Sequence, residues 1–136
     1  MGVSCAQPIA MHHHEVTIAP GDIDHMGHVN NAVYLNWVQD AVIAYWEKVA
    51  PAEAVARHLW VALKHEITYR RPAFLDDAVV ATVIAERVEG ARAMFTTLIQ
   101  RGEDVLVEVK SSWCALDTDT RRPVRVAKDL VRRFLG

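Results

Sequence analysis

The longest apolar stretch of the chain runs from Asn31 to about Val49 and contains neither glycine nor proline. Its apolar side chains occupy nearly the whole circumference of a helix, a pattern typical of a buried helix. Asn30 or Asn31 can cap the start of this helix, and Pro51 follows its end. At roughly 1.5 Å per residue the helix is about 28 Å long, which is enough to cross a small domain.

After a short second helix, expected at 52–57, the pattern changes to a period of two, which is typical of a strand. We expect this strand at 61–69. One of its faces carries Val61, Leu63, His65, Ile67 and Tyr69. The other face carries Ala62, Lys64, Glu66 and Thr68.

Five further elements are predicted. Alternation with β-branched residues predicts three strands, at about 77–88, 92–101 and 104–116. The two connections between them are of hairpin length and contain Gly90 and Gly102, which predicts an antiparallel meander. We also expect a first strand at about 15–19 and a closing helix at 127–135.

This order of elements predicts an α+β fold in which an antiparallel sheet of about five strands wraps around one long central helix. We expect one domain over residues 1–136, with residues 1–12 as a flexible N-terminal segment. A single open sheet leaves exposed edges, which proteins usually pair or cover. A homodimer or homotetramer is therefore expected.

Composition mainly excludes classes of function. The 136 residues are 51% apolar and 24% charged, which favours one compact domain. With 15 Lys and Arg against 17 Asp and Glu, the chain lacks the basic excess of a nucleic-acid-binding protein. Cys5 and Cys114 suggest neither a metal site nor a disulfide framework. No secretory signal or membrane span is recognisable, so we expect a cytoplasmic protein with no membrane partner.

The densest group of polar residues lies at 21–31, directly before the long helix. It holds two carboxylates, two imidazoles, two carboxamides and two glycines. The free N–H groups at the start of a helix can stabilise a developing negative charge, which is the oxyanion half of an acyl-transfer site. Asp24, Asp22 or His28 could supply the nucleophile or general base. The alternative is that these residues only build turns and a helix cap.

Other chemistries have weaker support. A metal site formed by the two aspartates with His25 and His28 is disfavoured, because His-x-x-His in a tight turn seldom directs both rings at one ion. We therefore expect no metal. We interpret the run 12–14, which is three histidines, as a solvated segment beside the first strand. The sequence contains no serine-hydrolase elbow, P-loop, dinucleotide fingerprint or Cys-x-x-Cys motif.

The segment Asp22-Ile-Asp24-His-Met-Gly27-His28-Val29 resembles the signature of the hotdog-fold thioesterases, in the branch of 4-hydroxybenzoyl-CoA thioesterase and related acyl-CoA thioesterases. Its continuation through Asn30-Asn31 to Tyr34 is also similar to plant acyl-ACP thioesterases. Downstream, Tyr69-Arg-Arg-Pro72-Ala73 and Trp113 to Asp117 match the strand ends of the same family. The resemblance covers nearly the whole chain and has the element order predicted above.

The resemblance implies a hotdog fold and an acyl-CoA or acyl-ACP thioesterase that needs no cofactor, since coenzyme A is part of the substrate. It implies that Asp24 is the catalytic carboxylate, as nucleophile or general base. The backbone N–H of Asn31, in the first turn of the helix, would polarise the thioester carbonyl. Gly27 would let the backbone pass close to the thioester. His28 and Asn30 would form hydrogen bonds or position water.

The substrate-binding candidates follow from the same resemblance and from side-chain chemistry. Arg70 and Arg71, next to Pro72, could meet the phosphates of coenzyme A. Tyr34 and Trp37 could line an acyl pocket, together with Val38 and Trp60, although core packing is the alternative for each. Asp40, on the long helix, is a reserve candidate for the base.

Two other functions remain open at this point. The first is a non-catalytic acyl-CoA-binding module in which Asp24 only caps the loop. The second is a hotdog hydratase or dehydratase in which Asp24 and His28 transfer protons at the acyl α-carbon.

Overall fold

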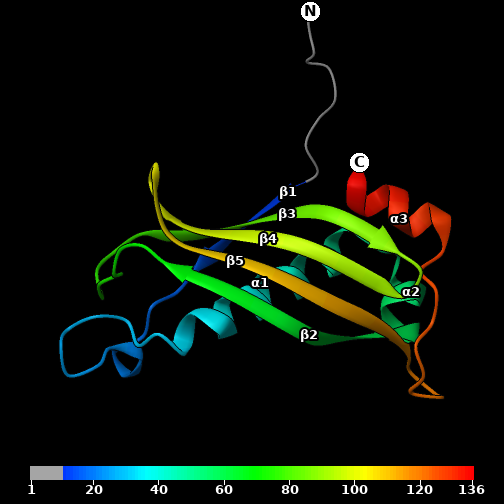
Figure 1. Cartoon of the computed structure of the whole chain (residues 1–136), viewed down its shortest axis with the longest axis horizontal. Helices are drawn as coiled ribbons and strands as arrows, with labels where there is room; N and C mark the ends of the chain where they lie inside the picture. Colours follow the sequence, from blue (N-terminus) through cyan, green and yellow to red (C-terminus); the bar gives the residue numbers. More distant parts are fainter. Residues whose placement is uncertain (1–10) are drawn as a thin grey trace, which may run out of the picture.

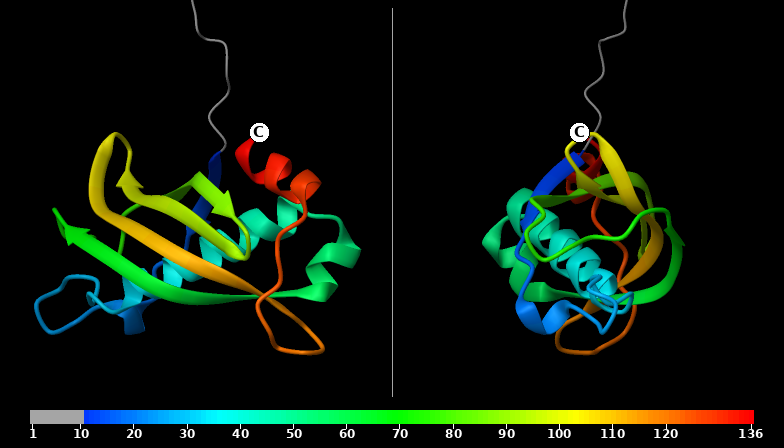
Figure 2. Two further views of the ribbon diagram at one scale, coloured as in Figure 1. Left: turned by 45° about the vertical axis from the view of Figure 1, so that its right-hand side comes forward. Right: turned by 90° about the vertical axis from the view of Figure 1, so that its left-hand side faces the viewer.

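Residues 11–136 are described by the computed structural model, which contains a five-stranded antiparallel sheet in the order β1-β3-β4-β5-β2 (Figure 1). The strands are β1 (Met11–Val16), β2 (His58–Tyr69), β3 (Val79–Glu89), β4 (Arg92–Arg101) and β5 (Asp104–Asp117). The helices are α1 (Val33–Val49), α2 (Ala52–Arg57), α3 (Lys128–Leu135) and a short 3₁₀ helix, η2 (Pro20–Asp22). The sheet curves around α1, which lies along its concave face (Figure 2).

Helix α1 is the expected long helix, and it begins two residues later than predicted. The expected cap by Asn30 or Asn31 is wrong, because the N-cap residue is Ala32 and it has no side-chain cap. Asn30 instead holds the turn before α1, since its Oδ1 accepts a hydrogen bond from the N–H of Ala32 at 3.0 Å. The expectation that α1 is buried all round is wrong, because the sheet of one chain covers only one side of it. Within residues 11–136, no helix is both long and apolar enough to cross a membrane. The buried residues of α1 are Tyr34, Trp37, Val38, Ala41, Val42, Tyr45 and Trp46. Its exposed polar residues are Asn36, Gln39, Asp40, Glu47 and Lys48.

Strand β1 starts earlier than the predicted strand at 15–19. It pairs antiparallel with β3, and the interpretation of the histidine run 12–14 as a solvated segment is wrong, since all three residues belong to this pairing. Met11 and His12 of the expected flexible segment are also in β1, while residues 1–10, including Cys5, lie outside the described residues. The sequence of β1 has no apolar alternation of its own, so its extended conformation depends on the pairing with β3.

The predicted two faces of β2 are only partly correct, because the strand contains a β-bulge. Ala62 pairs with Trp113 and Lys64 with Ser112, so Leu63 is the extra residue between two consecutive pairs. An extra residue inverts the alternation of side chains beyond it. Val61 and Leu63, expected on the face of His65, are 41% and 48% exposed as a result.

The meander of β3, β4 and β5 is confirmed, with antiparallel pairing along both hairpins. The hairpin turns place Gly90 at φ 58° and Gly102 at φ 61°. These values lie in the left-handed region, where glycine has no steric penalty. The two glycines therefore serve the turns that the sequence predicted.

An aromatic cluster closes the core beyond the C-terminal half of α1. Phe134, from α3, is 1% exposed. Its ring centroid lies 5.5 Å from those of Tyr45 and Trp46, 6.0 Å from that of Trp60 and 5.6 Å from that of Phe95. The Tyr45 hydroxyl also donates a hydrogen bond of 2.6 Å to the carbonyl of Phe134. Leu130 of α3 is also buried, and Arg133 donates a hydrogen bond of 3.0 Å to the carbonyl of Val49, so several side chains attach the last helix and Phe134 supplies its aromatic contacts.

Two imidazoles lie on the inner side of the sheet with both ring nitrogens buried and without a hydrogen-bond partner in the described part of the chain. His12 stacks on Tyr45, and His65 packs edge-on against Trp113. Desolvation lowers the pKa of both histidines below the ordinary 6.5, and Lys48 lowers that of His12 further. Each histidine therefore binds a proton more readily in the unfolded chain than in the folded one.

This predicts a stability that depends on pH near neutrality. The neutral forms of His12 and His65 contribute fully to the free energy of unfolding above pH 6.5. This contribution decreases as the pH falls through the lowered pKa values, because the unfolded state takes up more protons. We expect a lower urea midpoint at pH 5.5 than at pH 7.5 (about one pH unit on either side of the histidine range). His65→Leu removes an unpartnered polar group and is expected to raise the free energy of unfolding by about 1 kcal/mol and to reduce this pH dependence. A steeper dependence of the urea midpoint on pH in His65→Leu would contradict the conclusion that His65 causes part of it.

Candidate active site

The loop between η2 and α1 is held in a compact form by main-chain hydrogen bonds. The N–H of Asp24 donates to the carbonyl of His28 at 2.8 Å, and the N–H of Gly27 donates to the carbonyl of Asp24 at 3.0 Å. Gly27 has φ 83°, and a Cβ there would meet nothing within 4 Å. This glycine is thus required by the turn and not by a crowded environment.

The two aspartates of the loop have different surroundings. Asp22 Oδ2 accepts a hydrogen bond of 2.8 Å from the N–H of Ala19, which fixes the turn before the loop. Asp24 Oδ1 accepts hydrogen bonds from the N–H groups of Met26, at 2.9 Å, and His28, at 3.2 Å. Asp24 Oδ2 has no hydrogen-bond partner within residues 11–136. Among the described residues, the Asp22 side chain is therefore engaged in structure, while Asp24 keeps one free carboxylate oxygen.

Electrostatics favour the ionised form of Asp24. Desolvation raises the pKa of Asp24, but the amides of Met26 and His28 lower it, as do the side chains of His25 and His28. The lowering effects together are the larger, so the pKa of Asp24 lies below its ordinary value. The side chain is a carboxylate at neutral pH, as a nucleophile or general base must be.

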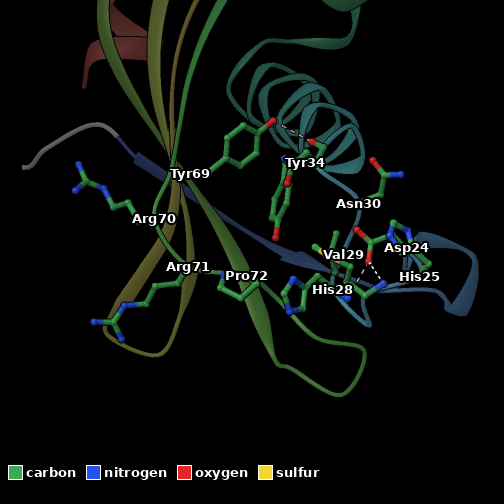
Figure 3. A pocket seen from close by; sticks show the side chains of 12 residues that line it. Asp24, His25, His28, Val29, Asn30, Tyr34, Tyr69, Arg70, Arg71 and Pro72 are labelled. Atoms are coloured by element: carbon green, nitrogen blue, oxygen red, sulfur yellow. Dashed lines mark hydrogen bonds between the residues drawn. The ribbon is translucent and has the colours of Figure 1, made fainter.

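This carboxylate borders a cavity of about 410 Å³ between the loop, the start of α1 and the end of β2 (Figure 3). Three hydrogen bonds join the two sides. The N–H of Val29 donates to the carbonyl of Ala73 at 2.9 Å, and the N–H of Ala73 donates to Tyr34 Oη at 3.1 Å. Tyr69 Oη donates to the carbonyl of Asn31 at 3.1 Å. The lining residues are Asp24, His25, Met26, His28, Val29, Asn30, Asn31, Tyr34, Tyr69, Arg70, Arg71 and Pro72.

Asn31 lies just before the helix, whereas the sequence predicted it in the first helical turn. It precedes the N-cap residue Ala32, so it belongs to the turn that leads into α1. Its N–H has no hydrogen-bond partner in the described part of the chain. The side chain of Asn30 is used in the same turn, where its Oδ1 accepts from the N–H of Ala32. Asn31, which carries the predicted oxyanion donor, therefore lines the same cavity as Asp24.

Several predicted site residues are placed elsewhere. Trp37 and the reserve candidate Asp40 line a separate cavity of about 450 Å³, together with Asp22. Gly27 is not among the residues that line the cavity of Asp24. Val38 is fully buried in the core, and Trp60 lies in the aromatic cluster around Phe134.

Arg70 and Arg71 border the cavity, but their side chains extend away from Asp24 (Figure 3). Arg70 forms an ion pair with Glu108 at 3.1 Å, and Arg71 lies 3.7 Å from Asp104. Their side chains remain 53% and 61% exposed, so both guanidinium groups are accessible from solvent.

Sequence reasoning missed Tyr69, which ends β2 and lines the cavity. The alternation of side chains along β2 indicates only the face of the sheet on which Tyr69 lies. The family resemblance could have pointed to Tyr69 as a site residue, since Tyr69 begins the matching segment that leads to Pro72. The His28 ring lines the cavity and packs edge-on against Phe74, with centroids 5.3 Å apart.

The arrangement suits chemistry at an acyl carbon. Asp24 and Asn31 line one cavity, and within residues 11–136 neither Asp24 Oδ2 nor the N–H of Asn31 has a hydrogen-bond partner. In acyl transfer, a carboxylate can act as nucleophile or base and a main-chain N–H as oxyanion donor. Within residues 11–136, no three His, Cys, Asp or Glu side chains are grouped in a way that could hold a metal ion.

Comparison with known proteins agrees with this chemistry. Residues 18–134 match the family described as Thioesterase-like superfamily. A probable thioesterase from Bartonella henselae is 25% identical, with a TM-score of 0.76 over 88% of this chain and 99% of that chain. A thioesterase from Thermus thermophilus, complexed with coenzyme A and Zn, is 23% identical, with a TM-score of 0.79 over 93% of this chain and 92% of that chain.

A third structure is a 1,4-dihydroxy-2-naphthoyl-CoA thioesterase from Synechocystis. It is 13% identical, with a TM-score of 0.76 over 91% of this chain and 95% of that chain. The fold predicted from the sequence, a long helix wrapped by a five-stranded antiparallel sheet, is thereby confirmed.

Proposed function

Because the chain belongs to the thioesterase-like superfamily and has the hotdog fold, we propose that it hydrolyses acyl-CoA or acyl-ACP thioesters to the free acid and the thiol. One observation carries this proposal. The ionised Asp24, with a free Oδ2, lines a cavity together with the unpaired N–H of Asn31.

In the proposed reaction, the carbonyl oxygen of the thioester accepts a hydrogen bond from the N–H of Asn31. Asp24 either attacks the carbonyl carbon or removes a proton from the water that attacks it. The tetrahedral intermediate then collapses, the C–S bond breaks, and the sulfur leaves as a thiolate. When Asp24 is the nucleophile, water hydrolyses the resulting anhydride and regenerates the carboxylate.

A thiolate is a good leaving group, so the reaction needs no strong general acid. This fits the residues around the cavity, where the N–H of Asn31 stabilises the oxyanion and Asp24 supplies the base or nucleophile. His28 and Asn30 border the same cavity and are proposed to position water or the thioester. Tyr34 and Pro72 line it and are proposed to contact the substrate.

The phosphates of coenzyme A are proposed to bind Arg70 and Arg71. Both side chains are more than half exposed and are held by acidic partners only at the surface. A phosphate can replace a surface carboxylate at small cost, since exposed ion pairs contribute little. Trp37 has no part in the proposed reaction, because the cavity that it lines is separate.

The proposal is tested by measuring release of free thiol from short, medium, long and aromatic acyl-CoA substrates and from an acyl carrier protein. We expect turnover of at least one class. Tight binding of acyl-CoA without turnover would instead support a non-catalytic binding module. Addition of water to an enoyl-CoA, without thiol release, would support a hydratase.

We also propose that two chains associate through the free edge of β2. This edge strand carries Val61, Leu63 and Tyr69, which are 41%, 48% and 46% exposed. An apolar edge strand is a surface for pairing with another strand. Because Tyr69 also lines the cavity of Asp24, such pairing would bring the partner chain to the site.

Light scattering after size exclusion is therefore expected to give a mass of two or four times the 15.3 kDa of one chain. Leu63→Lys is expected to shift the protein toward the monomer, because it places a charge in the pairing surface. Met94→Lys, at a similarly exposed apolar position on β4, is the matched control and should leave the mass unchanged. A monomeric wild type would contradict the proposal.

A further inference from the structure

Tyr69 connects the end of the sheet to the backbone that carries the unpaired N–H of Asn31. Its hydroxyl donates a hydrogen bond of 3.1 Å to the carbonyl of Asn31, across 38 residues of sequence. We propose that Tyr69 is a positioning residue, which holds the turn before α1 so that the N–H of Asn31 keeps its direction toward the cavity. This inference rests on the proposed thioester hydrolysis.

The sheet side of this link is held by main-chain hydrogen bonds. Tyr69 is the last residue of β2 and pairs with Val107 of β5. Directly after it, the N–H groups of Arg70 and Arg71 both donate to the carbonyl of Leu106, at 2.8 and 3.0 Å. The Tyr69 hydroxyl therefore has a fixed point of attachment.

The turn that receives the hydrogen bond is restrained from outside on its N-terminal side, where the N–H of Asn30 donates to the carbonyl of Asp22 at 2.8 Å and the N–H of Val29 to that of Ala73 at 2.9 Å. The hydrogen bonds of the turn that follow Asn30 are local. The N–H of Val33 donates to the carbonyl of Asn30 at 2.9 Å, and the N–H of Ala32 donates to Asn30 Oδ1 at 3.0 Å. Both bonds end on one neighbouring residue. The bond from Tyr69 ties the carbonyl of Asn31 itself to the sheet, which is a restraint from outside the turn.

Because Tyr69 is partly exposed, its proposed positioning role can be distinguished from a contribution to core packing. The residue is 46% exposed, whereas Tyr34, which packs edge-on against it with centroids 5.8 Å apart, is 1% exposed. Loss of an exposed hydroxyl has little effect on stability. An oxyanion donor, by contrast, must be directed accurately, and a misplacement of about 1 Å can cost on the order of 10²-fold in rate.

The test uses the full chain with Tyr69→Phe, which keeps the ring and removes only the hydroxyl. We expect kcat for thioester hydrolysis to fall about 10- to 100-fold, with KM changed by less than about twofold. Tyr45→Phe is the matched control, since it also removes a tyrosine hydroxyl that donates to a main-chain carbonyl, at the other end of the molecule. It should lower the melting temperature and leave kcat unchanged.

Amide hydrogen exchange of ¹⁵N-labelled protein gives a readout that does not depend on turnover. Ala32 and Val33 are expected to exchange about tenfold faster in Tyr69→Phe than in the wild type and at an unchanged rate in Tyr45→Phe. Unchanged exchange in Tyr69→Phe would overturn the inference, even if kcat falls, because the hydroxyl would then act without holding the turn. Faster exchange with an unchanged kcat would also overturn it.

The two proposals fail in different ways. If the wild type hydrolyses no thioester, the proposed function fails, and the exchange rates still decide whether Tyr69 holds the turn. If the wild type is active and Tyr69→Phe retains its full kcat, the proposed function stands and the positioning role is rejected.

Discussion

Asp24→Asn is expected to lower kcat for thioester hydrolysis by about 10²- to 10⁴-fold, the contribution typical of a positioned acid or base. Asparagine has nearly the same shape, and its Oδ1 can still accept the hydrogen bonds from the N–H groups of Met26 and His28. The loop should therefore stay folded. The side chain loses its charge, and with it the ability to attack the carbonyl or to accept a proton from water. Steady-state release of thiol measures the effect.

Two matched variants test whether the effect belongs to this position. Asp22→Asn changes the other aspartate of the loop, whose Oδ2 bonds to Ala19, and Asp40→Asn changes a carboxylate that lines a different cavity. Both should retain kcat within about threefold, since surface substitutions outside a site have small effects. Full activity of Asp24→Asn and Asp24→Ala would reject Asp24. Loss of activity only in Asp40→Asn would indicate that Asp40 of α1, and not Asp24, is the catalytic carboxylate.

Phe134→Ala is expected to lower the free energy of unfolding by about 3–5 kcal/mol, the range for removing a buried aromatic side chain. Phe134 is 1% exposed and packs against Tyr45, Trp46, Trp60 and Phe95. Its removal leaves a cavity among four rings and removes the aromatic contacts of α3, while Leu130 stays packed in the core. Urea unfolding followed by tryptophan fluorescence measures the loss, because Trp46 and Trp60 are direct neighbours.

Leu135→Ala is the control for this prediction. Leu135 is the next residue of α3 and is 37% exposed, so its truncation should cost less than about 1 kcal/mol. Equal losses in the two variants would show that α3 contributes through its helix formation and not through the Phe134 ring.

The elements that local patterns determine were predicted well. The helix at 52–57 has the predicted bounds, and β4 spans the predicted 92–101. Strand β1 was predicted too late, because its histidines have no apolar alternation and only the pairing with β3 places them in the sheet. The bulge at Leu63 was also invisible in the sequence, since a bulge arises when two strands of different local length are paired.

The candidate site was predictable where its residues are neighbours in sequence. The segment 21–31 supplied Asp24 and Asn31, and both line the cavity. Tyr69 was missed because its contact with Asn31 spans 38 residues. Tyr34 and Trp37 were both predicted to line an acyl pocket. Only the packed structure shows that Tyr34 lines the cavity of Asp24 and Trp37 a different one, because this depends on the direction of each side chain from α1.

Helix α1 separates two regions that substitutions can change independently. Its 17 residues span roughly 25 Å. The Asp24 cavity lies beside its first turn, at Tyr34, and the Phe134 cluster lies against Tyr45 and Trp46 near its end. Effects of substitutions at distant sites without shared partners are usually additive. A cavity reshaped to accept a new acyl group, with some loss of stability, can therefore be combined with stabilising substitutions around Phe134, and the engineered selectivity should be retained.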